Sequence, residues 1–232
     1  MEISAEKTKI MANNNADRIP NDINVNGQAL QSVNQFQYLG AIVTDEGSKP
    51  EILSRIAKAT TALAKLKPIW QDKNIRLCSK IRLLRSLVIS IFLYACESWT
   101  LTAELERKIS AVEMRCYRRL LGISYRDHIT NVEVKRRISQ AIGPHQDLLQ
   151  IVKNRKLRWY GHVTRHQGLT KTILQGTVEG GRKQGRPRKR WESNIKEWTG
   201  LNFAESQKAA QNREEWRRVV VTSSLMPQRP DG

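Results

Sequence analysis

Cysteine is scarce in this chain: Cys78, Cys96 and Cys116 lie 18 and 20 residues apart, and none belongs to a CxxC pair. Each falls among apolar positions of a predicted helix, so we expect small core residues rather than a disulfide or zinc framework. Long hydrophobic runs are also missing. The longest nearly apolar stretch, residues 87–95, is too short to span a bilayer, and the charged N-terminus lacks the apolar core of a signal peptide. We therefore expect an intracellular protein with no membrane partner.

A pair of adjacent aspartates that could hold catalytic metals is missing too. The seven aspartates include no neighbouring pair: Asp17, Asp22, Asp45, Asp72, Asp127, Asp147 and Asp231. No P-loop, dinucleotide fingerprint or Ser/His/Asp grouping is present. His162 and His166 have a spacing that can bind zinc, but no cysteine pair or nearby glutamate completes the usual four ligands. The sequence predicts no catalytic residue, no metal site and no cofactor in this chain.

Positive charge is abundant and unevenly placed. The chain has 40 lysines and arginines against 22 aspartates and glutamates, for a net charge of +18. Residues 51–150 carry 18 basic and 9 acidic groups, and residues 151–200 carry 13 and 3, whereas residues 1–50 are slightly acidic. Such clustering favours a polyanion-binding surface over a generally cationic, solvated one.

The first 45 residues resemble strand and turn material. Residues 25–28 (VNGQ) are a hairpin-turn signal, and the aromatic and β-branched content of residues 33–43 is typical of a strand. A lone hairpin buries too little apolar surface to be stable. This segment therefore depends on packing against other parts of the fold.

A helical block follows. Residues 48–51 (SKPE) fit a capping box, and Pro68 closes the first helix. That helix has an apolar stripe of Ile52, Ile56, Ala59, Leu63 and Leu66, with Arg55, Lys58 and Lys65 off the stripe. A second helix is predicted over residues 75–96, with Leu77, Ile81, Leu84, Val88, Ile91 and Ala95 on one face and Leu87 and Phe92 widening it. A third runs from Thr102 to Gly122, through Leu105, Ile109, Val112, Cys116 and Leu120. A second capping box, residues 130–133 (TNVE), opens a short helix that Gly143 ends.

The C-terminal part is basic and helical. The spacing of Leu149, Val152, Lys156 and Trp159 predicts a helix over residues 146–162. Residues 176–190 read as a flexible linker, residues 191–198 and 212–221 as short amphipathic helices, and residues 222–232 as a disordered tail.

Five strings in order resemble the end of the palm, the thumb and the C-terminal extension of a non-LTR retrotransposon reverse transcriptase. They are residues 36–44 (FQYLGAIVT) together with residues 2–11, then residues 81–100, 114–123 (MRCYRRLLGI), 156–163 (KLRWYGHV) and 185–191 (GRPRKRW). The resemblance implies a palm remnant at residues 1–45, a thumb-like helical bundle at 46–143 and a basic extension at 144–221. The fold class is mainly α with a small N-terminal β element, α+β by descent.

The resemblance also implies roles for single residues. Lys7 would lie near the phosphates of the incoming nucleotide, and Phe36, Tyr38, Leu39 and Gly40 would form the primer grip. In this family an aromatic-Ala-Asp-Asp turn lies upstream of these residues and holds the metals for phosphoryl transfer; no counterpart is present here. We expect Mg²⁺ for an intact polymerase only, with the fingers and most of the palm missing.

Two basic strings point to nucleic acid by themselves. Residues 185–188 (GRPR) resemble an AT-hook, which enters narrow A·T-rich minor grooves, with Gln184 in place of the usual arginine; a solvated basic linker that acts in nuclear import is the alternative. Arg155, Lys156 and Arg158 stand beside Trp159 and Tyr160, a basic and aromatic stretch that could stack on single-stranded bases. The alternative, which we favour, places Trp159 in the core and leaves phosphate contacts to the cations. The predicted nucleic-acid-binding residues are Lys7, Phe36, Tyr38, Leu39, Gly40, Lys58, Lys65, Arg118, Arg119, Arg155, Lys156, Arg158, Arg182, Lys183, Arg186, Arg188, Lys189 and Arg190.

The sequence therefore predicts a nuclear fragment of an RNA-directed DNA polymerase that binds RNA and DNA as template–primer duplex but does not polymerise. Two alternatives stay open: a co-opted, non-catalytic nucleic-acid-binding protein, and an inert pseudogene fragment that melts without cooperativity.

Overall fold

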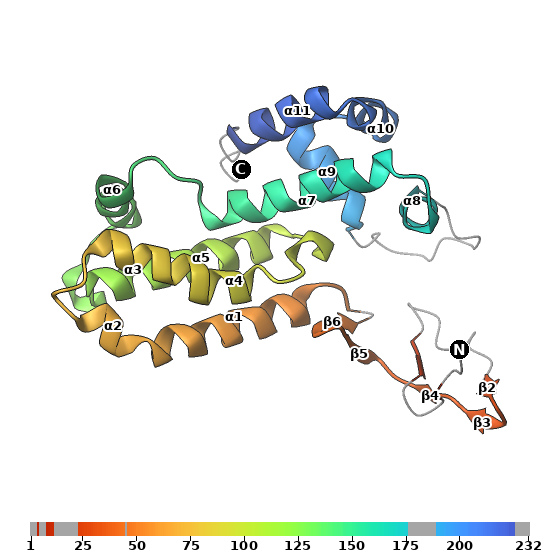
Figure 1. The fold of residues 1–232 in the computed structure, drawn as a ribbon, viewed down its shortest axis with the longest axis horizontal. Helices are drawn as coiled ribbons and strands as arrows, with labels where there is room; N and C mark the ends of the chain where they lie inside the picture. The colour runs from red at the N-terminus through yellow and green to blue at the C-terminus, as the bar shows by residue number, and fades with distance from the viewer. Residues whose placement is uncertain (1–3, 5–7, 12–22, 45, 176–188, 226–232) are drawn as a thin grey trace.

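Helices dominate the computed structural model, which describes residues 4, 8–11, 23–44, 46–175 and 189–225. Three long helices lie roughly parallel in Figure 1: α1 (Lys49–Lys65), α5 (Ala103–Leu121) and α7 (Leu148–Arg165). The short strands lie beyond the N-terminal end of α1. This arrangement confirms the predicted mainly α fold with a small N-terminal β element.

The N-terminal strands pair in twos. β1 (Lys9–Ile10) lies parallel to β4 (Gln31–Ser32), and β2 (Asn24–Val25) forms an antiparallel hairpin with β3 (Gln28–Ala29). The turn of this hairpin has φ of +52° at Asn26 and +78° at Gly27, as a two-residue turn with both central residues at positive φ requires. The hairpin signal at residues 25–28 is confirmed.

Residues 33–43 do not form the single strand that the sequence predicts. β5 (Gln35–Tyr38) pairs antiparallel with β6 (Ala41–Thr44), and the chain reverses at Leu39 and Gly40, where φ is +46° and +82°. The turn has Leu-Gly where Asn-Gly or Asp-Gly is the usual sequence signal, and leucine rarely adopts positive φ. β-Branched content alone could not reveal the reversal.

The predicted capping box at the start of α1 does not form. Ser48 occupies the N-cap position, but its hydroxyl accepts from the Thr100 N–H (2.8 Å) instead of from the helix. Glu51 is buried and binds Arg55, which the sequence placed off the apolar stripe and which is only 6% exposed. The side chains of Ser48 and Glu51 therefore make tertiary contacts instead of capping the helix, and a local sequence pattern cannot predict these contacts. α1 still begins at Lys49, and the chain continues after Leu66 into α2 (Lys67–Gln71) with Pro68 in its first turn.

The predicted helix over residues 75–96 is shorter and irregular. α3 (Leu77–Leu83) passes into a π-helical turn, η2 (Leu84–Ile89), and then into α4 (Ser90–Phe92); Ala95, with φ of +56°, precedes a 3₁₀ turn, η3 (Cys96–Ser98). A π turn adds a residue and rotates the following side chains. Phe92 is fully buried as expected, but Leu87, which lies within the π turn, is 44% exposed, which corrects the prediction that it widens the buried face.

The next two helices follow the sequence closely. The Thr102 hydroxyl caps α5, and Gly122 ends it in the left-handed region with φ of +67°. After a 3₁₀ turn, η4 (Tyr125–Asp127), Thr130 caps α6 (Asn131–Ile142) through the Glu133 N–H. The carboxylate of Glu133 binds Arg136 and Arg137 instead of closing the second capping box.

Four helices cover the C-terminal side: α8 (Leu169–Gln175), α9 (Trp191–Thr199), α10 (Phe203–Gln211) and α11 (Arg213–Leu225). The sequence predicted α9 and most of α11 but missed α8 and α10. α11 continues into the segment from residue 222 that was expected to be disordered.

Buried residues from α1 to α11, from Ile52 to Val220, form one continuous core. Of the three cysteines, Cys96 and Cys116 are buried and Cys78 is partly buried, all as free thiols.

A polar network inside this core joins α7, α9 and the loop before α5. The Lys156 side chain is fully buried, and its Nζ donates to the Trp99 carbonyl (2.7 Å) and to Asn194 Oδ1 (2.9 Å). Asn194 in turn exchanges two hydrogen bonds with the Leu101 backbone, each of 2.8 Å. The predicted phosphate contact of Lys156 is therefore wrong, because this amine serves the packing of α7 on α9. No helix in the described part of the chain is long and apolar enough to cross a membrane.

Candidate nucleic-acid interface

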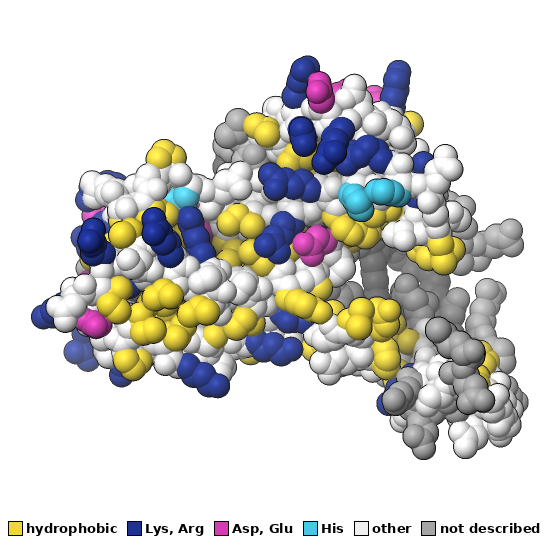
Figure 2. Space-filling view, viewed as in Figure 1, with side chains coloured by type: hydrophobic (Ala, Val, Ile, Leu, Met, Phe, Trp, Pro, Cys, Tyr) yellow, Lys and Arg dark blue, Asp and Glu magenta, His cyan; other side chains and the backbone are white. Residues whose placement is uncertain are grey.

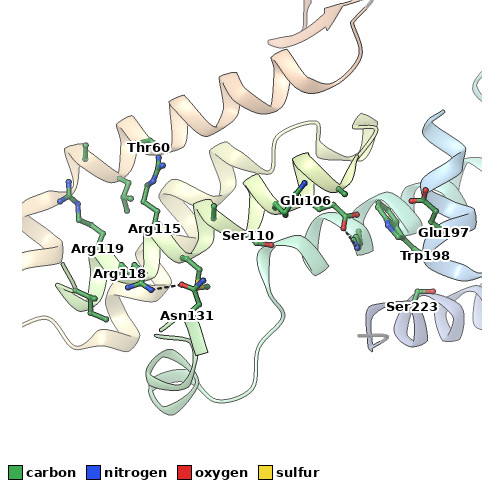
Figure 3. A pocket seen from close by; sticks show the side chains of 18 of the residues that line it. Thr60, Glu106, Ser110, Arg115, Arg118, Arg119, Asn131, Glu197, Trp198 and Ser223 are labelled. Atoms are coloured by element: carbon green, nitrogen blue, oxygen red, sulfur yellow. Dashed lines mark hydrogen bonds and ion pairs between the residues drawn. The ribbon is translucent and has the colours of Figure 1, made fainter. Parts of the chain in front are cut away.

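An open groove of about 1470 Å³ runs along α5, between α1 on one side and α9 and α11 on the other (Figure 3). Its cationic lining comes from four arginines of α5 and one lysine each of α7 and α9: Arg107, Arg115, Arg118, Arg119, Lys153 and Lys196. The acidic residues that line it are Glu106 and Glu197. The groove therefore has an excess of positive charge.

Most of this charge is free to meet a ligand. Within the described residues, the side chains of Arg107, Arg115 and Arg119 form no ion pair or hydrogen bond, and all three residues are exposed. Arg118 is fixed instead, because it donates to the Ile129 carbonyl (2.7 Å) and to Asn131 Oδ1 (2.9 Å). Free guanidinium groups suit phosphate oxygens, which they can bind with two parallel hydrogen bonds.

Helical periodicity explains why the arginines share one side of α5. Arg107, Ala111, Arg115 and Arg118 follow one another at intervals of four, four and three residues, so they lie on one face. The apolar residues Leu105, Ile109 and Val112 occupy another face and are buried. The sequence analysis found Arg118 and Arg119 but missed Arg107 and Arg115, although this spacing was a signal that could have revealed them.

The β5–β6 turn is held on α1 and on Tyr94, which follows α4. Arg55 Nη2 donates to the Gly40 carbonyl (2.5 Å), and the Tyr94 hydroxyl donates to the Leu39 carbonyl. The Arg55 Cζ atom also lies 4.3 Å from the centre of the Tyr94 ring. Arg55 Nε pairs with Glu51 Oε1 (2.6 Å), and Glu51 Oε2 accepts from the Ile42 N–H (2.8 Å). We call Glu51, Arg55 and Tyr94 the turn clamp.

The turn clamp leaves the tip of the hairpin in solvent. Tyr38 is 62% and Leu39 76% exposed, while Phe36 and Gly40 are partly buried. None of these four residues lines the α5 groove. The structure therefore separates the predicted primer grip from the predicted cations Arg118 and Arg119, and Lys7 lies outside the described residues.

The other predicted binding residues are scattered. Lys58 and Lys65 are exposed on α1 but do not line the groove, and Arg158 is exposed on α7. Arg155 lies near Leu93 and Glu97, with its Nη1 3.3 Å from the Leu93 carbonyl. Lys189 pairs with Glu197 (2.7 Å), and Arg190 is exposed at the N-cap of α9. The AT-hook-like residues and their neighbours, Arg182, Lys183, Arg186 and Arg188, lie outside the described residues.

The remaining residues singled out in the sequence are Trp159 and the histidines His162 and His166. Trp159 is partly buried and packs edge-on against Trp191, with ring centres 5.3 Å apart, so it belongs to the packed side of α7. The rings of His162 and His166 lie 4.3 Å apart. Among the described residues, no group of three or more histidine, cysteine, aspartate or glutamate side chains could hold a metal ion.

Comparison with known proteins gives one informative likeness. The chain is 28% identical over 237 residues to an uncharacterized transposon-derived protein of Caenorhabditis elegans, and the match covers 95% of this chain and 82% of that protein. No family model and no solved structure matches the chain. The likeness over nearly the whole chain indicates that it originated in a transposable element.

Proposed function

We propose that this chain corresponds to the C-terminal part of a non-LTR retrotransposon reverse transcriptase and binds RNA and DNA through the α5 groove. The free arginines of that groove, Arg107, Arg115 and Arg119, carry the proposal. A groove with uncompensated guanidinium groups releases counterions when it binds a phosphate backbone, which is the main source of sequence-independent affinity. Such a protein acts in the nucleus.

The family assignment within this proposal is supported by where the resembling strings lie. The string at residues 36–44 forms the β5–β6 hairpin, and Tyr94, from the string at residues 81–100, binds its turn. The string at residues 114–123 supplies Arg115, Arg118 and Arg119 to the groove. Likeness to a transposon-derived protein agrees with this source.

Binding without polymerisation is the activity we propose for the isolated chain. Two-metal phosphoryl transfer needs carboxylates that hold both ions, and the 232 residues contain no adjacent pair of aspartates. A co-opted, non-catalytic binding protein would share these features. The two differ in whether the reading frame upstream of Met1 encodes an aromatic-Ala-Asp-Asp turn, which mapping of the transcript's 5′ end would decide.

The first test is binding of a fluorescein-labelled DNA primer annealed to RNA, followed by anisotropy over a range of salt concentrations. We expect a groove variant, Arg107→Gln/Arg115→Gln/Arg119→Gln, to bind more weakly and to lower the slope of log K against log salt by about 2 to 3, given a slope of about 0.9 for each lost phosphate contact. Equal binding by the groove variant and the wild-type chain would reject the α5 groove. Extension of the primer by the wild-type chain would reject the non-catalytic part of the proposal.

The matched control is Lys67→Gln/Lys73→Gln/Arg76→Gln. These three cations are exposed at or near α2 and do not line the groove, so the control removes the same charge at another place. An equal loss in both variants would mean that net charge, not the groove, determines binding.

A further inference from the structure

A second set of basic side chains lies on α7, on the side away from the α5 groove. Arg158, His162 and Arg165 follow at intervals of four and three residues, so they lie on one helical face, and His166 is adjacent. Lys153, which lines the groove, is nine residues before His162. Nine residues are two and a half turns of helix, so the two side chains leave α7 in opposite directions.

Helix α11 brings two more arginines to this face. Trp216 of α11 packs on Gly161, and its Nε1 donates to the Leu157 carbonyl (2.8 Å). A Cβ atom at position 161 would lie 2.3 Å from Trp216 Cδ1, so the contact requires glycine. This close approach sets Arg213 and Arg217, which are one turn apart and flank Trp216, near Arg165.

The electrostatics of Arg165 show that these charges act on one another. Burial lowers the pKa of Arg165, and repulsion by Arg213 and Arg217 lowers it further. Arg165 Nη1 donates to the Ala210 carbonyl (2.8 Å), which fixes the guanidinium in place. Among the described residues, Arg158, Arg165, Arg213 and Arg217 form no ion pair with a carboxylate.

Figure 2 shows the result on the surface: lysine and arginine side chains gather over α7 and α11, beside a pair of histidines. Clustered like charges without acidic partners raise the local potential and attract a polyanion. The Arg165 guanidinium, which the Ala210 carbonyl holds in place, loses less freedom on binding than a mobile one would.

We propose that the α7–α11 face, formed by Arg158, His162, Arg165, Arg213 and Arg217, is a second binding surface for the phosphate backbone of a nucleic acid strand. It rests on the proposed function, since it assumes a nucleic-acid ligand, but it adds a site on the opposite side of α7 from the groove. One chain would then hold two strands, or one strand that passes around α7.

The test uses a face variant, Arg158→Gln/Arg213→Gln/Arg217→Gln, which spares the structural Arg165. Binding of a short labelled oligothymidine to the full chain is followed by anisotropy across salt, beside the groove variant and the α2 control, each of which loses three cations. We expect the face variant to bind more weakly than the control and to lower the salt slope by about 2, at about 0.7 for each contact with a single strand. The combined face and groove variant should lose both contributions, and circular dichroism checks that every variant is folded.

The outcomes separate the two proposals. If the groove variant loses affinity while the face variant matches the control, the second surface is refuted and the proposed function stands. If neither variant differs from the control, or if the wild-type chain does not bind, the proposed function fails as well. A charge-preserving variant, Arg158→Lys/Arg213→Lys/Arg217→Lys, should restore the slope, and failure to restore it would point to a packing defect and overturn the proposal.

Discussion

At the scale of single residues, Lys156 is the most unusual side chain of the core. It is fully buried, it lies 4.3 Å from the centre of the Trp191 ring, and no carboxylate pairs with it among the described residues. Burial, followed by repulsion from Lys189, lowers the pKa of Lys156 to about 6, while Glu197 opposes the shift. A neutral amine has two N–H donors, and these match the two acceptors at Trp99 and Asn194.

The depressed pKa of Lys156 predicts how stability depends on pH. Above about pH 6 the folded chain holds neutral Lys156, whereas the unfolded chain keeps this lysine protonated up to its ordinary pKa of 10.5. The unfolded state therefore binds more protons between these values, and the free energy of unfolding rises with pH. We expect the urea midpoint to increase from neutral to mildly alkaline pH. In Lys156→Met the increase should be smaller, and an unchanged increase would assign the effect to other groups.

Gly161 gives a second prediction at this scale. Gly161→Ala places a methyl group against the Trp216 ring, which its hydrogen bond to Leu157 holds in place. We expect Gly161→Ala to lower the free energy of unfolding by about 1 to 3 kcal/mol, as is typical of overpacking, and urea unfolding measures this change. Trp216→Leu frees the space, so in a double-mutant cycle the pair should be less destabilised than the sum of the single changes. Additive effects would show that the contact is not tight.

At the scale of elements, the turn clamp explains how a two-stranded hairpin stays ordered. A lone hairpin is marginal in water, but here its turn carbonyls and the Ile42 N–H bind side chains of α1 and the side chain of Tyr94, which follows α4. The Glu51–Arg55 pair is buried, with side chains 4% and 8% exposed. The clamp thus ties the β5–β6 hairpin to α1 and to the segment after α4.

Removing one partner of this buried pair should destabilise the chain strongly. Arg55→Met leaves the Glu51 carboxylate without its cation, which we expect to cost about 3 to 5 kcal/mol in urea unfolding. Arg55→Met/Glu51→Leu removes the unpaired charge and should recover part of that loss. Tyr94→Phe keeps the ring and deletes the donor to Leu39, so hydrogen exchange should accelerate in β5 and β6 but not in α5. Equal protection of β5 and β6 in Arg55→Met, in Tyr94→Phe and in the wild-type chain would contradict the clamp.

At the scale of the whole molecule, one core joins helices α1 to α6 to the C-terminal helices. The network of Lys156, Asn194 and Leu101 lies where α7, α9 and the loop before α5 meet, and Trp191 Nε1 donates to the Glu97 carbonyl (2.9 Å) nearby. We expect far-ultraviolet circular dichroism to show a single, cooperative helical melt. A broad melt, or a separate early transition of the C-terminal helices, would instead support the pseudogene reading.

The local sequence determined much of the helical framework. Thr102 and Gly122 bound α5, Thr130 opens α6, and the Asn26-Gly27 turn forms as expected, because each of these signals acts within one or two turns of chain. The uneven charge can also be read from the sequence, and it predicts a polyanionic ligand.

Tertiary structure decided the roles of side chains that a local pattern treats alike. Ser48 and Glu51 resemble a capping box but bind distant backbone, and Lys156 resembles a phosphate ligand but lies in the core. Arg115 and Arg158 are both exposed cations on helices, yet one lines the α5 groove and the other belongs to the opposite face of α7. The physical reason is that burial and pairing depend on which elements pack together, and that choice is made by contacts between residues far apart in the chain.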